Sequence, residues 1–183
     1  MKKVERSELL DYVTYTQQRP EIQQSVLVQK NIRRVHLGEY LTFLFENTET
    51  TKYQIQEMMR VERIVKEEAI LHEMQTYNDI LGGDKELGCT LMIEFVDPDY
   101  RDKQLRLLVG LPEHIYLVLE DGKKVYCDFD KNQVGDERVS SVQFLKFKCS
   151  SAPIKIGTDH PEMKIEQELS EDQKSTFKMD LQY

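Results

Sequence analysis

The sequence is short of cysteine and of long apolar runs, and each shortage excludes a class of protein. Its three cysteines, Cys89, Cys127 and Cys149, lie far apart and form no CxxC pair, which argues against a disulfide framework and a zinc finger. No apolar run approaches the roughly 18 residues that a membrane span needs. The opening MKKVERSELLDYV shows no apolar signal segment, so we expect a cytoplasmic protein.

Several catalytic and cofactor signatures are also absent. The chain has no GxGxxG, P-loop, HExxH or GxSxG motif, so it gives no support to a dinucleotide enzyme, a P-loop protein, a zincin or an α/β-hydrolase. Three scattered cysteines cannot supply the four thiolates usual for an iron–sulfur cluster within one chain. We find no flavin, nucleotide or iron–sulfur motif, and the cofactor, if there is one, stays unknown.

Basic residues are outnumbered. The 183 residues include 33 acidic and 25 basic side chains, a formal net charge of -8. An acidic surface repels phosphate, and no basic stripe with interleaved aromatic residues is present, so nucleic acid is not an expected partner. The basic doublet Arg33-Arg34 predicts a solvated start of a strand.

The first half of the chain combines helical patterns with one β-hairpin. Ser7 predicts the cap of a short helix, and Pro20 the first turn of a second helix that ends near Asn31. Alternating apolar residues on both sides of Gly38 predict a hairpin over 35–46.

The longest helical pattern spans residues 53–77, where apolar residues recur at steps of three and four on one face. Alternation over 89–95 predicts a strand after this helix. Asp97 followed by Pro98 is typical of the start of another helix.

Strand patterns dominate the second half. Runs at 115–119 and 125–129 flank Asp121-Gly122, a strong hairpin signal, and 139–149 alternates as a third run. Together they predict an antiparallel β-meander. We expect a loop over 150–161 with a short strand at 154–156.

A last amphipathic helix is expected after Ser170, because Gln173 stands at capping-box spacing. Helices and strands that are partly segregated along the chain indicate an α+β fold. We expect a single domain over 1–183, with a helical arm at 1–31, an α+β core at 33–149, and a loop and helix at 150–183.

Glu62 is the main candidate for a functional carboxylate. At about 100° per residue, it falls on the apolar face of the predicted long helix. A buried carboxylate must be paired, protonated or bound to a cation. One interpretation is an ion pair with Lys66 or an arginine, and the other is a carboxylate cluster with Glu73 and Glu94 that binds a metal or transfers protons.

Histidines offer further candidates. Glu68 and His72 lie one turn apart beside Glu57, but two ligands do not make a metal site. His160 lies in a predicted loop, which could aim it into a cleft as a ligand or proton-transfer group. His36 and His114 look like isolated strand residues.

Two weaker patterns were also considered. Asp128, Asp130 and Asn132 match the first oxygen positions of an EF-hand loop, but the later positions do not fit, so a polar loop is favoured. Cys89 and Cys127 are expected in the core, whereas Cys149, at a strand end beside Lys148, is a candidate for an exposed and somewhat activated thiol, although the sequence shows no resolving cysteine near it.

Five segments together resemble a bacterial family of uncharacterised proteins, known only as a domain of unknown function. They are YTQQRPEI from Tyr15, RRVHLGEYLTFLFEN from Arg33, YQIQEMMRVERI from Tyr53, TLMIEF from Thr90 and GTDHP from Gly157. The resemblance extends from about Leu9 to about Glu168 and implies no established catalytic residue. Members are often encoded beside rubrerythrin and an iron–sulfur oxidoreductase, which implies a redox or oxidative-stress setting and electron-transfer partners.

The resemblance draws attention to a set of polar positions that either form a buried network or line a site. They are Arg33, Glu46, Asn47, Gln54, Gln56, Glu57, Arg60, Glu62, Glu94, Asp159 and His160.

Two functions follow as hypotheses. The first is an accessory or binding protein of a cytoplasmic redox system. The second is a metal-binding protein or enzyme with a carboxylate-rich pocket made of Glu57, Arg60, Glu62, Glu94 and His160, in which Glu62, Glu94 and His160 would be the metal ligands. A purely structural or scaffolding subunit is a third possibility.

Overall fold

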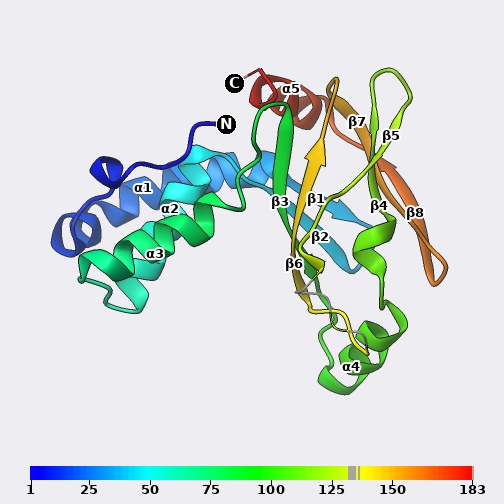
Figure 1. The fold of residues 1–183 in the computed structure, drawn as a ribbon, viewed down its shortest axis with the longest axis horizontal. Coiled ribbons are helices and arrows are strands. Elements are labelled where there is room, and N and C mark those ends of the chain that lie inside the picture. The colour runs from blue at the N-terminus through cyan, green and yellow to red at the C-terminus, as the bar shows by residue number, and fades with distance from the viewer. Residues whose placement is uncertain (132–134, 136, 183) are drawn as a thin grey trace.

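The computed structural model describes residues 1–131, 135 and 137–182, and its mixture of helices and antiparallel sheets confirms the α+β class. Two four-stranded sheets pack against each other, and three helices extend to one side of them (Figure 1). No helix in the described part of the chain is long and apolar enough to cross a bilayer.

Helix α1 (Tyr12–Arg33) follows a 3-10 turn, η1 (Arg6–Glu8), and its N-cap Asp11 accepts hydrogen bonds from the next turn. The expected division into two helices at Pro20 was wrong, because α1 runs through Pro20 without interruption. A proline removes one backbone hydrogen bond. Packing of α1 along α2 and against β2 compensates for that loss.

The expected hairpin is confirmed as β1 (Arg34–Leu37) and β2 (Leu41–Phe45), with Gly38 at a positive φ of 63° in the turn. Glycine adopts this left-handed conformation without steric cost.

The predicted long helix is two helices, α2 (Thr48–Val61) and α3 (Glu67–Asn78), so this prediction was wrong. Glu62 ends α2, and Arg63 has a positive φ of 54° in the connection. The break folds the two helices back on each other, which brings their apolar residues into a single cluster with Val4 and Leu9. Burial of both apolar faces outweighs the continuity of one helix.

The first sheet has the order β1-β2-β3-β6 and includes β3 (Glu86–Ile93) and β6 (Val142–Lys148). The third run of the expected meander therefore pairs with β3, and an isolated bridge between Asp128 and Lys146 connects it to the chain after β5. Between β3 and β6 lie α4 (Pro98–Leu107), which starts at Asp97 as expected, and a 3-10 turn, η2 (Leu111–His114).

The second sheet has the order β5-β4-β7-β8. Its strands are β4 (Ile115–Leu119), β5 (Lys124–Tyr126), β7 (Pro153–His160) and β8 (Met163–Glu168). The hairpin of β4 and β5 is confirmed, whereas the expected loop at 150–161 was wrong over most of its length. It forms β7, whose backbone is hydrogen-bonded on both sides by β4 and β8.

The last helix, α5 (Glu171–Asp180), has the expected reciprocal cap between Ser170 and Gln173. It packs against the end of the main core, which lies between the inner faces of the two sheets and contains Phe43, Leu91, Leu117, Ile156 and Phe177. Helices α1, α2 and α3 lie on the side of the first sheet, α4 and α5 lie at opposite ends of the sheets, and the outer face of the second sheet is uncovered (Figure 1).

Candidate functional site

The five residues predicted to form one polar cluster are distributed over separate parts of the molecule. Glu57 and Arg60 lie on α2, Glu94 follows β3, and His160 ends β7. The hydrogen bonds of each group connect it to its own neighbours and not to the other groups. The prediction of a single carboxylate-rich pocket from these residues was therefore wrong.

Glu57 is the centre of a polar cluster in the helical part. Its two carboxylate oxygens accept hydrogen bonds from Nε and Nη2 of Arg19, at 2.8 and 2.9 Å. Arg60 lies at 3.3 Å on the same helix, and the hydroxyl of buried Tyr15 donates at 2.8 Å. Hydrogen bonding by Arg19, supported by Arg60 and Tyr15, lowers the pKa of Glu57 to about 2.

This cluster joins two segments of the family resemblance, because Tyr15 and Arg19 come from the first helix and Glu57 and Arg60 from the second. Burial and the nearby Glu57 carboxylate raise the pKa of the Tyr15 hydroxyl. Since both carboxylate oxygens of Glu57 accept from side chains of the two helices, the geometry of the cluster is that of a connection between α1 and α2.

Glu62, the main candidate from the sequence, is exposed. Its carboxylate makes no hydrogen bond or ion pair with the described residues, so the expectation of a buried and paired carboxylate was wrong. The helical angle that placed Glu62 on the apolar face assumed a continuous helix, and α2 ends at this residue.

Glu94 belongs to a short hydrogen-bonded chain on the outer face of the first sheet. The hydroxyl of Thr42 donates to its Oε2 at 2.5 Å, and Nδ1 of His36 lies 2.9 Å from the same hydroxyl. Because the single proton of Thr42 is used on Glu94, His36 must donate through Nδ1. Both Glu94 and His36 are exposed.

His160 is buried at the end of β7, with 5% of its surface exposed. Its Nε2 lies 3.1 Å from the carbonyl oxygen of Val109, and its Nδ1 accepts from the backbone N–H of Glu162 at 3.3 Å. Since a carbonyl only accepts and an N–H only donates, the proton is on Nε2 and both ring nitrogens are occupied. His160 therefore has no free nitrogen for a metal or a substrate in this structure.

The sequence did not predict the contacts of His114, which was expected to be an isolated strand residue. Its Nδ1 lies 2.8 Å from Oδ1 of Asp159, and the hydroxyl of Tyr126 donates to Oδ2 at 2.6 Å. These hydrogen bonds lower the pKa of Asp159. The His114 ring packs edge to face with the His160 ring, and their centroids are 5.1 Å apart, so His114 is in contact with both a carboxylate and a second imidazole. Its Nε2 makes no hydrogen bond with the described residues.

The GTDHP segment acquires a structural explanation from this arrangement. A Cβ atom at Gly157 would lie 2.7 Å from the Tyr116 ring, so only glycine allows that ring to lie across the strand. Asp159 points to the outer face and His160 to the inner side, as alternation along β7 requires. His114 lies next to Asp159 because β4, which follows His114, pairs with β7. The sequence does not show which strands pair, so this contact could not be predicted from it.

Most of the other highlighted polar positions also have structural partners. Arg33, expected to be solvated, is buried and forms a two-point ion pair with Asp180 at 2.7 and 3.0 Å, so that expectation was wrong. The remaining pairs are Glu46 with Thr50, Asn47 with the backbone of Thr50, Gln54 with Tyr77, and Gln56 with the backbone of Leu10.

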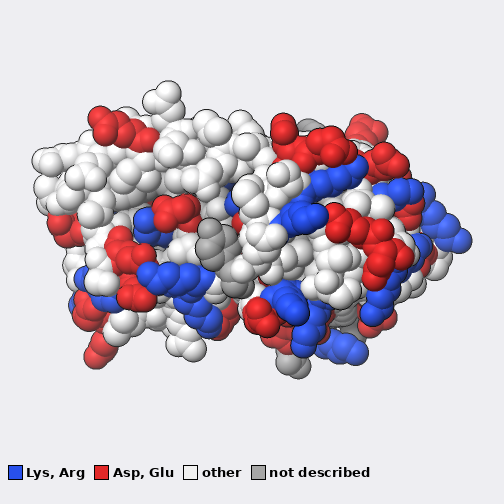
Figure 2. Space-filling view, turned by 90° about the horizontal axis from the view of Figure 1, so that it is seen from above, with Lys and Arg blue, Asp and Glu red and all other residues white. Residues whose placement is uncertain are grey.

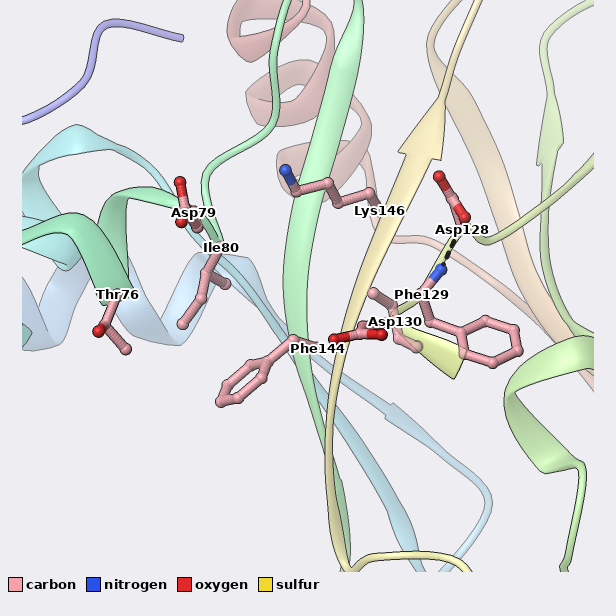
Figure 3. Close-up of a pocket in the computed structure, with 9 residues that line it drawn as sticks. Thr76, Asp79, Ile80, Asp128, Phe129, Asp130, Phe144 and Lys146 are labelled. Carbon is pink, nitrogen blue, oxygen red and sulfur yellow. Dashed lines mark hydrogen bonds between the residues drawn. The ribbon is translucent and has the colours of Figure 1, made fainter. Parts of the chain in front are cut away.

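A cavity of about 560 Å³ lies between the end of α3 and β6 (Figure 3). Asp128 and Asp130, from the EF-hand-like pattern, lie on one side of it and Asp79 on the other, while Asn132 lies outside the described residues. Within the described part of the chain, no three His, Cys, Asp or Glu side chains are grouped so as to hold a metal ion. Glu68 and His72, the other metal candidates, are exposed on α3.

The three cysteines are shielded from solvent to different degrees. Cys89 and Cys149 are buried, and Cys127 is half-buried with its thiol 2.9 Å from the carbonyl oxygen of Pro112. Burial raises the pKa of Cys127 and of Cys149 to about 12. The expectation of an exposed and activated Cys149 was wrong, because the strand end that carries it is covered.

Comparison with known proteins identifies the family but no activity. The family model described as "Protein of unknown function (DUF3501)" matches residues 3–181. A crystal structure of a "novel protein of unknown function" from Burkholderia pseudomallei K96243 is similar, with 30% sequence identity and a TM-score of 0.91. The match covers 98% of this chain and all of that chain. No curated protein matches.

Proposed function

Because the chain belongs to the DUF3501 family, described as proteins of unknown function, we propose a function from its own surface: it is an accessory protein that binds a protein partner through α1. The observation that carries this proposal is an exposed face of α1 without a single charged side chain. Residues on it follow the helical repeat, with Glu21 at the edge of the face, and they are Val13, Gln17, Pro20, Gln24, Leu27, Val28 and Asn31.

This face is unusual for a protein in which 32% of the residues are charged. Val13 and Val28 expose 62% and 60% of their surface, and Leu27 exposes 45%. The helical half shows a broad surface with few charged side chains at the upper left of Figure 2, with acidic side chains at its upper edge. Depletion of charge together with exposed apolar side chains is the composition of the centre of a protein interface.

The basic residues of α1 are directed elsewhere. Arg19 pairs with Glu57, Lys30 lies over the ring of Tyr53, and Arg33 pairs with Asp180. The uncharged face therefore does not result from a lack of charged residues in α1, and it is available to a partner.

We infer that the partner is an electron-transfer protein of the cytoplasm, a rubrerythrin or an iron–sulfur oxidoreductase, as the family resemblance implies. The chain would assist such a protein without holding a cluster of its own. The shielded thiols agree with this division of roles, because a thiol with a raised pKa is a poor nucleophile for disulfide exchange.

The test is a binding measurement by biolayer interferometry with purified rubrerythrin and the iron–sulfur oxidoreductase of the same organism. We expect one of them to bind, and Val28→Lys to weaken binding at least tenfold, because a lysine on this face must be desolvated. Val65→Lys is the matched control, since Val65 is equally solvent-exposed but lies between α2 and α3. Absence of binding, or equal binding by Val28→Lys, would contradict the proposal.

A further inference from the structure

A cleft between α1 and α2 carries a second inference, which does not depend on the proposed function. The cleft has a volume of about 420 Å³ and is closed at one end by the segment around Leu10. We propose that it binds a small organic amine, a ligand with an ammonium group on an apolar stem. The argument rests on its apolar floor, its unpartnered polar groups and the sign of its charge.

The floor of the cleft is apolar. Ile22 and Val26 follow each other by one turn on α1, and the ring of Tyr53 faces them from α2. Val26 and Tyr53 are more than nine-tenths buried. A ligand with an apolar stem would cover this floor and remove it from water.

The segment around Leu10, which lines the cleft together with α1 and α2, is held in place before any ligand binds. Gln56 accepts a hydrogen bond from the backbone N–H of Leu10 at 2.6 Å and donates to its carbonyl oxygen at 3.2 Å. The amide thereby fixes the segment before α1 against α2. A preformed cleft avoids the entropy cost of ordering its walls when the ligand binds.

Polar groups without protein partners line the same cleft. Glu21, Ser25 and Gln29 stand at i, i+4 and i+8 and therefore form one line along α1. The side-chain oxygen of Gln29 accepts a hydrogen bond from the side-chain amide of Asn47 at 3.0 Å, and the amino group of Gln29 has no hydrogen-bond partner among the described residues. The hydroxyl of buried Tyr53 makes no hydrogen bond with the described residues. Because these groups open onto the cleft and are not hydrogen-bonded within the described part of the chain, they are available to a ligand.

The charge of the cleft favours a cation. Its lining includes three carboxylates and one ammonium group. Glu8 is paired with Lys2 at 3.3 Å, and Glu49 with Lys52 at 3.0 Å. Glu21 forms no ion pair with the described residues, and Lys30, which lies 5.1 Å from the centre of the Tyr53 ring, is more than two turns away along α1, so the negative charge is local to Glu21. An ammonium group is attracted to this position, whereas a carboxylate ligand is repelled.

The test is an NMR titration of the ¹⁵N-labelled full chain with three matched probes: 4-phenylbutylamine, 4-phenylbutanol and 4-phenylbutyrate. We expect the amine to shift the resonances of Ser25, Gln29 and Tyr53. Its Kd should be at least fivefold lower than that of the alcohol, and the carboxylate should bind most weakly. Glu21→Gln should abolish the preference for the amine, and Glu62→Gln should preserve it, since Glu62 is exposed outside the cleft.

Three results would overturn the proposal. They are equal affinities of the amine and the alcohol for the wild-type protein, shifts confined to residues outside the cleft, and an unchanged preference in Glu21→Gln. Since Glu21 is exposed, Glu21→Gln is expected to fold normally, and its NMR spectrum would verify this.

Discussion

At the scale of single residues, Glu57 shows how one carboxylate can hold two helices together. Three side chains donate to it, two of them from α1, and only 15% of its side-chain surface is exposed. Charge-assisted hydrogen bonds to a shielded carboxylate are stronger than those between neutral groups. The energetic importance of Glu57 is therefore structural, and removal of its charge should affect stability first.

Glu57→Gln should lower the free energy of unfolding by about 2–3 kcal/mol, because it leaves the guanidinium of Arg19 without its two-point partner. Urea unfolding followed by circular dichroism measures this change. Glu62→Gln is the matched control on the same helix end and should change stability by less than about 0.5 kcal/mol, since it is exposed and unpaired. Equal effects of the two variants would contradict this role of Glu57.

The pH dependence of stability should reveal the same residue. The folded pKa of Glu57 is about 2, below the ordinary value of 4.5. The unfolded chain therefore binds this proton more readily, so the stabilisation is complete above about pH 4.5 and is lost as the pH falls toward 2. Wild-type stability should decline more steeply over this window than that of Glu57→Gln. Parallel curves for the two proteins would show that the titration lies elsewhere.

The cysteines permit a third prediction at the residue scale. With pKa values of about 12, Cys127 and Cys149 should react with Ellman's reagent at pH 8 at least about a hundredfold more slowly than a free thiol. Cys89 should be equally protected by burial. All three should react at once in denaturant. A cysteine that reacts rapidly with Ellman's reagent in the folded protein would show that its thiol is not shielded as the structure describes.

At the scale of secondary-structure elements, the ion pair of Arg33 and Asp180 connects the end of α1 to the end of α5. Both side chains are 9% exposed, and Nε of Arg33 is buried without a hydrogen-bond partner. A buried pair of this kind contributes little net energy compared with apolar residues, but it is costly to break. The effect of replacing either Arg33 or Asp180 on stability therefore depends on whether the other is still present.

Asp180→Ala should lower the free energy of unfolding by about 3–5 kcal/mol, since it leaves a buried guanidinium uncompensated. The double variant Arg33→Met with Asp180→Leu should recover a large part of the loss, because it removes both charges and retains apolar volume. Thermal unfolding of the single and double variants makes the comparison. A double variant no more stable than Asp180→Ala would show that the pair contributes through packing alone.

At the scale of the whole molecule, the helical part and the two sheets are connected at several points. The N-terminal ammonium group donates to the carbonyl oxygens of Gly82 and Gly83 just before β3, at 3.1 and 3.3 Å. Helix α1 continues directly into β1. Arg33 and Asp180 add a third connection. These connections favour the single domain over 1–183 that the sequence leads us to expect.

We therefore predict that the chain unfolds in one cooperative transition. The calorimetric and van't Hoff enthalpies should agree, and circular dichroism and tyrosine fluorescence should give the same midpoint. Because Tyr15 and Tyr53 lie in the helical part and Tyr116 in the second sheet, the two halves both contribute to the fluorescence. Two separate transitions would show that the helices form an independent unit.

The sequence by itself determined the features that depend on neighbouring residues. The hairpin at Asp121-Gly122, the start of α4 at Asp97 and the cap at Ser170 follow from the chemistry of three or four successive positions, and the α+β class follows from the order of such local patterns along the chain. Such interactions act within one turn, and so they can be recognised without knowledge of the fold.

Only the tertiary structure decided where distant segments meet. It ended α2 at Glu62 so that α2 and α3 could bury their apolar faces together, and it placed β6 in the first sheet. It also joined His114 to Asp159, 45 positions apart, and Arg33 to Asp180, 147 positions apart. The periodicity of one segment reports that a face is buried, but the partner of each polar side chain depends on which elements pack against that face.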